Sequence, residues 1–324
     1  MSSLWRMITL AAVVAVYCLS SFGQTAEQPV VLTIDVEDYV LYRGDVTDSS
    51  KQGWDPGVTT PLPAIAFQVS HGVGDIVAVS GKPSKGLLTY RVATLSSRVN
   101  PQPGQAIADV DGTGGAFCFW QILGPDGDWV GNLLDGGAFP ESQHTITGGA
   151  GAFFGVTGGH RIQETIRAGR TASITEDPAN RRINGGGKWR AVYYVYPKYR
   201  PSVNVTAAGP AVFHTDFSPV TVTNPARSGE VLVVVARNLG PVRPDLLPPG
   251  TRPLKADPVE VVNSPVEVTI NGRESEVINA VGWPGTADLY RLDFRVPSGI
   301  APGLVTLQLT AAWIPGPEVK IPVQ

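Results

Sequence analysis

The sequence predicts an all-β protein in which a closed antiparallel β-barrel is followed by a β-sandwich. Its 324 residues include 37 Gly and 28 Pro, a composition that disfavours long helices and favours short strands joined by turns. No stretch between residues 28 and 197 keeps a helical period over three turns. Short apolar runs instead recur between turn residues, as is typical of sandwiches and barrels.

The N-terminal segment predicts secretion. Arg6 precedes an almost entirely apolar run over residues 8–19, and Ser21 and Gly23 offer the small residues of a cleavage site. The run is shorter than the ~20 apolar residues of a membrane-spanning helix. We therefore expect a signal peptide over residues 1–23, a secreted product (extracellular or periplasmic) and no membrane span after cleavage. After this cleavage Cys118 is the one cysteine that remains, so an intramolecular disulfide is excluded. A secreted protein without disulfides points to a bacterial product.

Residues 28–197 are expected to form the barrel. Leu32, Ile34 and Val36 alternate with polar residues, the pattern of a half-buried strand. Closing the sheet removes its exposed edges. Further strands are expected at residues 64–69, 75–80, 87–97, 105–111, 116–123, 129–134, 143–147, 152–157, 162–166, 170–175 and 188–195.

A glycine-rich stretch over residues 145–159 is expected to supply the bulges, corners and close backbone approaches of this domain. Its structural residues are Gly148, Gly149, Gly151, Phe153, Gly155 and Gly158. With the turn at residues 111–114 and the Phe117-Cys118-Phe119 strand, the stretch resembles the signature of the dirigent and allene oxide cyclase-like barrels, with Ala150 in place of a threonine. The resemblance implies eight strands around a lumen that can hold a small apolar molecule. Some members of that superfamily isomerise or steer phenolic or lipid-derived substrates, but no catalytic residue maps onto this chain.

After a proline-flanked linker at residues 198–202, residues 203–324 are expected to form an immunoglobulin-like sandwich of about seven strands. Residues 230–236, 289–296 and 304–313 read as strands, and Asn271-Gly272 predicts a tight hairpin turn. In order along the domain, Gly229-Glu230-Val231, Leu239-Gly240-Pro241 and the segments 268–272 and 289–297 resemble the IPT/TIG-like C-terminal domain of Solibacter-type secreted proteins of Acidobacteria. That resemblance implies no catalytic role.

Most familiar sites are excluded by single residues. Phe154 replaces the third glycine of a dinucleotide-binding turn, Trp189 replaces the Ser or Thr of a P-loop, and Trp120 replaces the last glutamate of an EF-hand. The four histidines show no metal-ligand spacing, and Cys118 is interpreted as a packed core residue rather than a nucleophile. Two interpretations are open for Asp126, Asp128 and Asp135. They either bind calcium loosely or, as we favour, accept hydrogen bonds from backbone N–H groups in turns. We therefore predict no cofactor and no metal.

The remaining candidates for chemistry are polar groups in the barrel interior. Alternation puts Phe117 and Phe119 on one face and Cys118 and Trp120 on the other, without saying which face is inside. Tyr90, Arg91, His144, His160 and Glu164 are candidates for inward-facing acid–base groups. The alternative, which is commoner for charged residues, is that they face solvent.

These observations lead to three hypotheses. The first is a non-catalytic binding or scaffold protein with a small apolar ligand in the barrel. The second is an isomerase or stereochemical guide acting on an apolar substrate there, and the third is cell-surface adhesion or self-association through the sandwich. A net charge of −3 gives no reason to expect a nucleic-acid partner. An enclosed polar pair would argue against the scaffold, and a filled lumen would argue against the isomerase.

Overall fold

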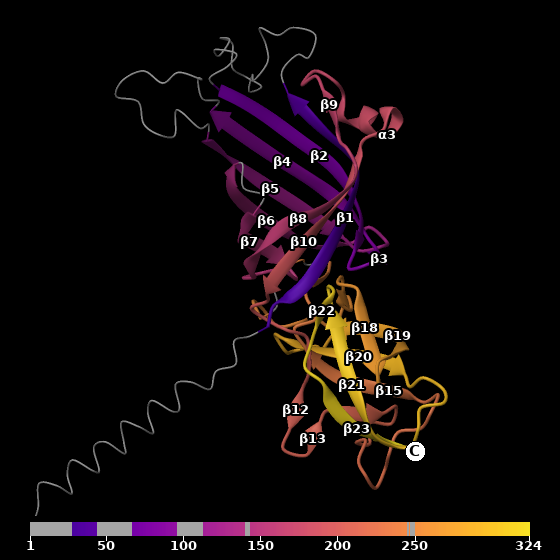
Figure 1. Cartoon of the computed structure of the whole chain (residues 1–324). Helices are drawn as coiled ribbons and strands as arrows, with labels where there is room; N and C mark the ends of the chain where they lie inside the picture. The colour runs from indigo at the N-terminus through magenta and orange to yellow at the C-terminus, as the bar shows by residue number, and fades with distance from the viewer. Residues whose placement is uncertain (1–27, 44–66, 96–112, 140–142, 245, 247–249) are drawn as a thin grey trace, which may run out of the picture.

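The computed structural model describes residues 28–43, 67–95, 113–139, 143–244, 246 and 250–324. It is nearly all β (Figure 1). Helical structure in this part is limited to η2 (Pro178–Asn180) and α3 (Arg181–Asn184). None of the described helices is long and apolar enough to cross a bilayer. The signal peptide expected at 1–23 and the strand expected at 105–111 lie outside the described residues.

In the first unit, each of eight long strands pairs with two neighbours. The antiparallel order is β2-β4-β5-β6-β7-β8-β10-β1, and β1 pairs with β2 as well as with β10. Short strands β3 (Lys82–Pro83) and β9 (Arg170–Ala172) flank this set. The long strands are β1 (Val30–Arg43), β2 (Phe67–Val79), β4 (Lys85–Leu95), β5 (Thr113–Leu123), β6 (Trp129–Phe139), β7 (Gln143–Gly151), β8 (Thr157–Arg167) and β10 (Gly187–Tyr196).

The glycine-rich stretch differs from expectation in one place. Residues 152–157 were expected to be a strand, but β7 ends at Gly151 and the chain turns before β8. Gly151 and Gly155 have φ values of 63° and 73°, which side chains rarely adopt and which reverse the chain direction. The turn buries Phe153 completely. The described part of the strand expected at 64–69 and residues 75–79 of the next expected strand belong to one continuous strand, β2, which ends at Val79; residues 64–66 lie outside the described residues.

The buried side of the first sheet carries Cys118 and Trp120, whereas Phe117 on the other side is 69% exposed. The structure thus resolves which side of β5 faces inward. Alternate residues of β1 and β10 complete the same core, among them Leu32, Ile34, Trp189 and Tyr193.

The second unit closes one end of this core. Between β21 (Gly303–Ala311) and β22 (Ile314–Pro315), Ala312 and Trp313 form a tip with φ values of 49° and 61°. Ala312, Trp313 and Ile314 are buried in the same hydrophobic cluster as Trp120. Residue 313 was expected to end a strand, but its positive φ makes it a turn residue. The Asn263 side chain also donates a hydrogen bond to the Trp129 carbonyl of the first unit, at 3.1 Å.

The chain leaves β10 at Tyr196 and enters the second unit at β11. There β15 pairs with β11, β14 and β20, and β21 pairs with β18, β22 and β23, all antiparallel. β19 joins the two groups by pairing with β18 through its first residues and with β20 through the rest. The strands not yet delimited are β11 (Ser202–Val203), β12 (Val205–Thr206), β13 (Gly209–Pro210), β14 (Val212–His214), β15 (Val231–Arg237), β16 (Val242–Arg243), β17 (Val261–Val262), β18 (Val266–Ile270), β19 (Arg273–Gly282), β20 (Leu289–Arg295) and β23 (Val319–Val323).

The hairpin predicted at Asn271-Gly272 is confirmed. These two residues join β18 to β19 with φ values of 48° and 75°. Positive φ at both central positions is the requirement of a type I′ turn. The core of the second unit includes Leu232, Leu292, Phe294 and Leu307.

Candidate functional site

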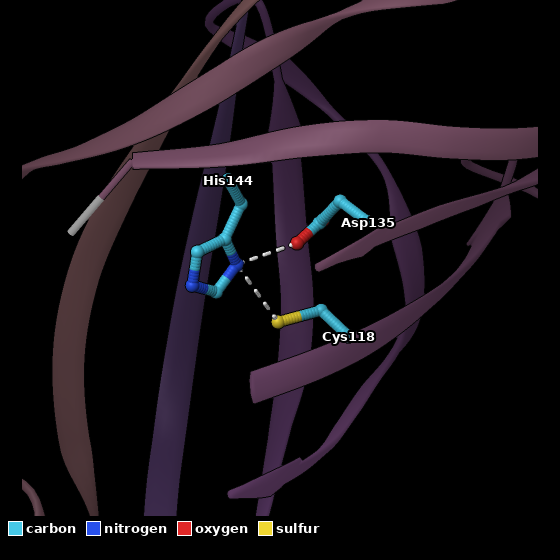
Figure 2. Close-up of side chains that lie close together, drawn as sticks. All are labelled: Cys118, Asp135 and His144. Carbon is cyan, nitrogen blue, oxygen red and sulfur yellow. Dashed lines mark hydrogen bonds and ion pairs between the residues drawn. The ribbon is translucent and has the colours of Figure 1, made fainter. Parts of the chain in front are cut away.

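Strand register brings three polar side chains together inside the first unit. Cys118 on β5 is the direct cross-strand partner of Asp135 on β6. His144 on β7 lies one step further along the sheet, next to Thr145, which pairs with Gly136. Figure 2 shows the three side chains pointing toward one another. We refer to Cys118, Asp135 and His144 as the polar cluster.

Asp135 is the centre of the cluster. Its side chain is fully buried, and one oxygen, Oδ1, lies 2.7 Å from His144 Nδ1. The other oxygen accepts a hydrogen bond from Trp120 Nε1 at 2.7 Å and another from the Tyr193 hydroxyl. Burying a carboxylate is costly unless hydrogen bonds satisfy it. Because an ionised carboxylate only accepts hydrogen bonds, this arrangement places a proton on His144 Nδ1.

The groups around Asp135 hold their own protons. Burial, followed by the nearby Asp135 charge, raises the pKa of the Tyr193 phenol well above its usual value. The same two causes, in the same order, raise the pKa of the Cys118 thiol. Both groups therefore stay neutral at physiological pH.

The cluster does not have the geometry of a nucleophile–base–acid relay. Cys118 Sγ lies 3.7 Å from His144 Nδ1, the same nitrogen that contacts Asp135. A relay uses one ring nitrogen for the nucleophile and the other for the acid. A thiol with a raised pKa is also a poor nucleophile, in agreement with the interpretation of Cys118 from sequence.

A tyrosine pair lies beside the cluster. Tyr90 on β4 is the cross-strand partner of Cys118, and the Tyr39 hydroxyl donates a hydrogen bond to the Tyr90 hydroxyl. The two rings stack at 5.9 Å with an interplanar angle of 14°. Gly72 on β2 leaves the space for this arrangement, because a Cβ there would lie 1.8 Å from Tyr90 Cε1.

Edge-to-face aromatic contacts connect the tyrosine pair to the cluster. Tyr39 meets Trp189 at 5.9 Å, Trp189 meets Trp120 at 5.7 Å, and Trp120 meets Tyr193 at 5.6 Å. These rings fill the middle of the interior, so the Asp135 carboxylate is surrounded by aromatic side chains rather than by bulk water.

The candidates from sequence divide between the two faces of the sheet. Tyr90 and His144 take part in the interior arrangement, whereas Arg91 and Glu164 are exposed. The backbone of His160 pairs with His144 and with Tyr193; its side chain lies outside the described residues. The tyrosine and histidine were thus placed on the inner face by the structure, not by the sequence pattern.

Asp135 is the residue that the sequence interpretation assigned wrongly. It was grouped with Asp126 and Asp128 as a turn aspartate, but it lies in β6 and is fully buried. Asp126 is exposed in the turn and Asp128 pairs with Arg243. Counting the β5–β6 register outward from the Leu123–Trp129 pair at that turn would have placed Leu134 opposite Cys118, and only the register shift between Ile122 and Leu123 puts Asp135 there.

The cluster also offers three different metal-ligand atoms. Cys118 Sγ, a carboxylate oxygen of Asp135 and a ring nitrogen of His144 all lie within 4.8 Å of one another. The search of the sequence for ligand spacing missed this set, because its members come from three successive strands. Chemically, the arrangement can donate hydrogen bonds to a polar atom, exchange a proton or coordinate a cation.

A groove of about 740 Å³ lies outside the core, beside α3 and strands β2, β4 and β5. Asp75 accepts hydrogen bonds there from Arg181 and from Arg182, the latter at 2.6 Å from Nε. These ion pairs attach α3 to the outer side of β2.

The comparisons with known proteins do not assign this chain to a family. No family model matches it, and no curated protein matches it. Among solved structures, it is similar to a polysaccharide lyase at 9% sequence identity and a TM-score of 0.18. That alignment covers 92% of this chain and 40% of the lyase, so the chain spans less than half of that protein's length. A TM-score this low supports no conclusion about fold or function.

Proposed function

We propose that this chain is a secreted bacterial protein that binds a small, mainly apolar molecule in its first unit, at the end of the interior near His144, since aromatic rings fill the middle. The first unit would be a closed antiparallel barrel of the allene oxide cyclase-like kind, and the second an immunoglobulin-like sandwich. The pairing of β1 with both β10 and β2 supports closure. The core of the second unit, shared by strands on either side of β19, supports the sandwich.

The polar cluster is the observation that carries the proposal. Its Asp135–His144 pair argues against an inert scaffold, and because the His144 side chain is 11% exposed, the pair can still be reached by a ligand. An interior otherwise filled by apolar and aromatic side chains contains a buried carboxylate with fixed hydrogen-bond partners. Ligand sites in proteins are mostly apolar, with a few convergent polar groups that orient the ligand. The cluster would receive the polar group of the ligand.

The direction of entry follows from the two ends of the unit. Trp313 closes the end where β2 finishes and β4 begins. His144 is the second residue of β7 and lies near the opposite end of the unit. Its side chain is 11% exposed. A ligand would therefore reach the cluster past His144.

Binding can be measured with the full mature chain and a fluorescent fatty acid probe. We expect saturable binding at one site, with quenching of the interior tryptophans Trp120 and Trp189. His144→Ala should weaken the affinity at least ~10-fold, which corresponds to about 1.4 kcal/mol. Arg91→Ala, a change of an exposed residue on β4, is the control and should bind like the wild type.

Two outcomes would contradict the proposed ligand site. If the fatty acid probe and a phenolic probe both fail to bind saturably, and solvent extraction of the purified protein yields no small molecule, the proposal is wrong. Binding that Arg91→Ala weakens as much as His144→Ala would place the ligand outside the interior.

A second candidate function is proton transfer of the isomerase type. The Asp135–His144 pair favours it, because a carboxylate and an imidazole in hydrogen-bond contact can exchange a proton with a substrate. The aromatic filling around Trp120 restricts such a substrate to the end near His144. Incubation of a bound ligand with the protein in deuterated water should then label the ligand, and Asp135→Asn should abolish labelling.

A further inference from the structure

We propose that the polar cluster binds one Zn²⁺ ion, with Cys118 Sγ, His144 Nδ1 and Asp135 Oδ1 as its protein ligands. The inference concerns the same residues as the proposed ligand site but rests on a separate observation, the geometry of the three ligand atoms. It stands or falls independently of whether a small molecule binds.

The spacing of the ligand atoms is close to that of a tetrahedral zinc site. Metal–ligand distances of about 2.3 Å to sulfur and about 2.0–2.1 Å to nitrogen and oxygen put sulfur about 3.6 Å, and oxygen about 3.3 Å, from the nitrogen. The observed Cys118 Sγ–His144 Nδ1 distance is 3.7 Å. The Asp135 Oδ1–His144 Nδ1 distance is 2.7 Å, so the ion would replace this hydrogen bond and part the two atoms by about 0.6 Å.

The surroundings of Asp135 orient it as a ligand. Trp120 Nε1 and the Tyr193 hydroxyl both donate to Oδ2, which turns Oδ1 toward His144 and Cys118. Outer hydrogen bonds of this kind fix the orientation of ligating carboxylates in metal sites. Trp120 is fully buried, and so is Tyr193, so these two donors are held firmly by packing.

The charges and atom types select the metal. A cysteine thiolate, an aspartate and a neutral histidine together neutralise a divalent cation in a site that is otherwise apolar. The raised pKa of the thiol means that the ion must displace its proton on binding. The proton on His144 Nδ1 must also leave that atom, so that the bound imidazole is neutral with its proton on Nε2, and the thiol proton is released to solvent. A mixed set of sulfur, nitrogen and oxygen ligands suits Zn²⁺, whereas Mg²⁺ and Ca²⁺ require oxygen ligands alone.

Three protein ligands leave the fourth position of a tetrahedral ion for a water or for a polar atom of a bound molecule. Zinc sites that act on substrates have this arrangement, and purely structural ones have four protein ligands. The partial exposure of His144 places the cluster within reach of such a molecule.

The test uses the full mature chain after dialysis against a chelator. We expect Zn²⁺ to bind with a stoichiometry of one per chain, measured by elemental analysis after gel filtration. Co²⁺ should give a sulfur-to-cobalt charge-transfer absorption that Zn²⁺ abolishes. Cys118→Ser and His144→Ala should each weaken binding more than about 100-fold, and Tyr193→Phe about 10–100-fold.

The matched control is His214→Ala, which removes a histidine that pairs with Glu230 in the second unit. It should leave Zn²⁺ binding unchanged. Absence of stoichiometric binding and of the cobalt–thiolate band in the wild type overturns the inference, with no need for a variant that folds. Binding that survives both Cys118→Ser and His144→Ala overturns it as well.

The fluorescent fatty acid probe separates this inference from the proposed function. If the probe binds equally with and without chelator while Zn²⁺ does not bind, the ligand proposal stands and the zinc proposal fails. If Zn²⁺ binds while the fatty acid and phenolic probes both fail and solvent extraction yields no small molecule, the zinc proposal stands and the ligand proposal fails.

Discussion

The Tyr193 hydroxyl on β10 donates a hydrogen bond to the Asp135 carboxylate on β6, across the interior of the first unit. Both side chains are fully or almost fully buried. This contact joins strands that are not neighbours in the sheet, so it links two parts of the sheet through the interior.

Replacing Tyr193 by phenylalanine should destabilise the protein by about 1.5–3 kcal/mol, the range for a hydrogen bond to a charged group. The buried carboxylate would lose a donor while the shape of the ring is kept. Chemical denaturation with urea measures the change. Tyr194→Phe, on the 45% exposed neighbour, should change stability by less than about 0.5 kcal/mol, and an equal effect at both positions would contradict the assignment.

Gly72→Ala should destabilise the protein by about 1–3 kcal/mol through overpacking. Its Cβ would lie 1.8 Å from the Tyr90 ring, which the hydrogen bond with Tyr39 holds in place. Thermal unfolding followed by circular dichroism gives the result. The control is Gly115→Ala on β5, where the nearest atom to the new Cβ is 3.6 Å away; this change should be neutral or slightly stabilising.

Trp313→Ala should cost about 3–5 kcal/mol, as expected for truncating a buried tryptophan. Because Trp313 belongs to the core of the first unit, calorimetry should also show that the two units unfold less cooperatively. Leu304→Ala on β21, the strand that leads into the tip, at a position 66% exposed, should have little effect. Unchanged unfolding of Trp313→Ala would show that the tip does not contribute to the first unit's core.

The pair of His214 and Glu230 predicts how the stability of the second unit changes with pH. Burial lowers the pKa of His214, but hydrogen bonds to Glu230 and to the Asn224 carbonyl outweigh it, and the net pKa is raised. The nearby Asp216 acts in the same direction. The protonated His214 therefore contributes its full stabilisation below the pKa of about 6.5 that histidine has in the unfolded state. This stabilisation is lost as the pH rises through the pKa of His214 in the folded state.

The melting temperatures of the wild type and of His214→Gln should therefore differ most at about pH 5.5 and converge toward about pH 8.5. Glu230→Gln should reduce the same pH dependence, because only the Asn224 carbonyl and Asp216 would then favour the charged imidazole. A difference that grows as the pH rises would mean that the pKa of His214 is lowered instead.

Sequence patterns predicted the strand-rich architecture and the Asn271-Gly272 hairpin, because period-two alternation and turn chemistry are local signals. Alternation also paired Cys118 with Trp120 on one face, but burial of that face depends on strands distant in sequence. Asp135 was missed because it precedes Gly136-Gly137 and so looked like a turn residue. Its position is set by register with β5 and by the hydroxyl of Tyr193, which no local pattern reports.

Trp313 was also misassigned, as the last residue of a strand, because local sequence patterns do not show a contact with residues distant in the chain. Its sequence neighbours are apolar, and only the positive φ values of Ala312 and Trp313 show a tip. The partner of that tip is a core built by residues from the other half of the chain.

That tip has a consequence for the order in which the protein matures. During synthesis from the N-terminus, the strands of the first unit, which end at Tyr196, leave the ribosome long before residue 313. One end of the interior of the first unit therefore stays exposed until the β21–β22 hairpin has been synthesised and has packed against it. A truncated product lacking that hairpin should accordingly be prone to aggregation and proteolysis, even though it retains every strand of its own sheet.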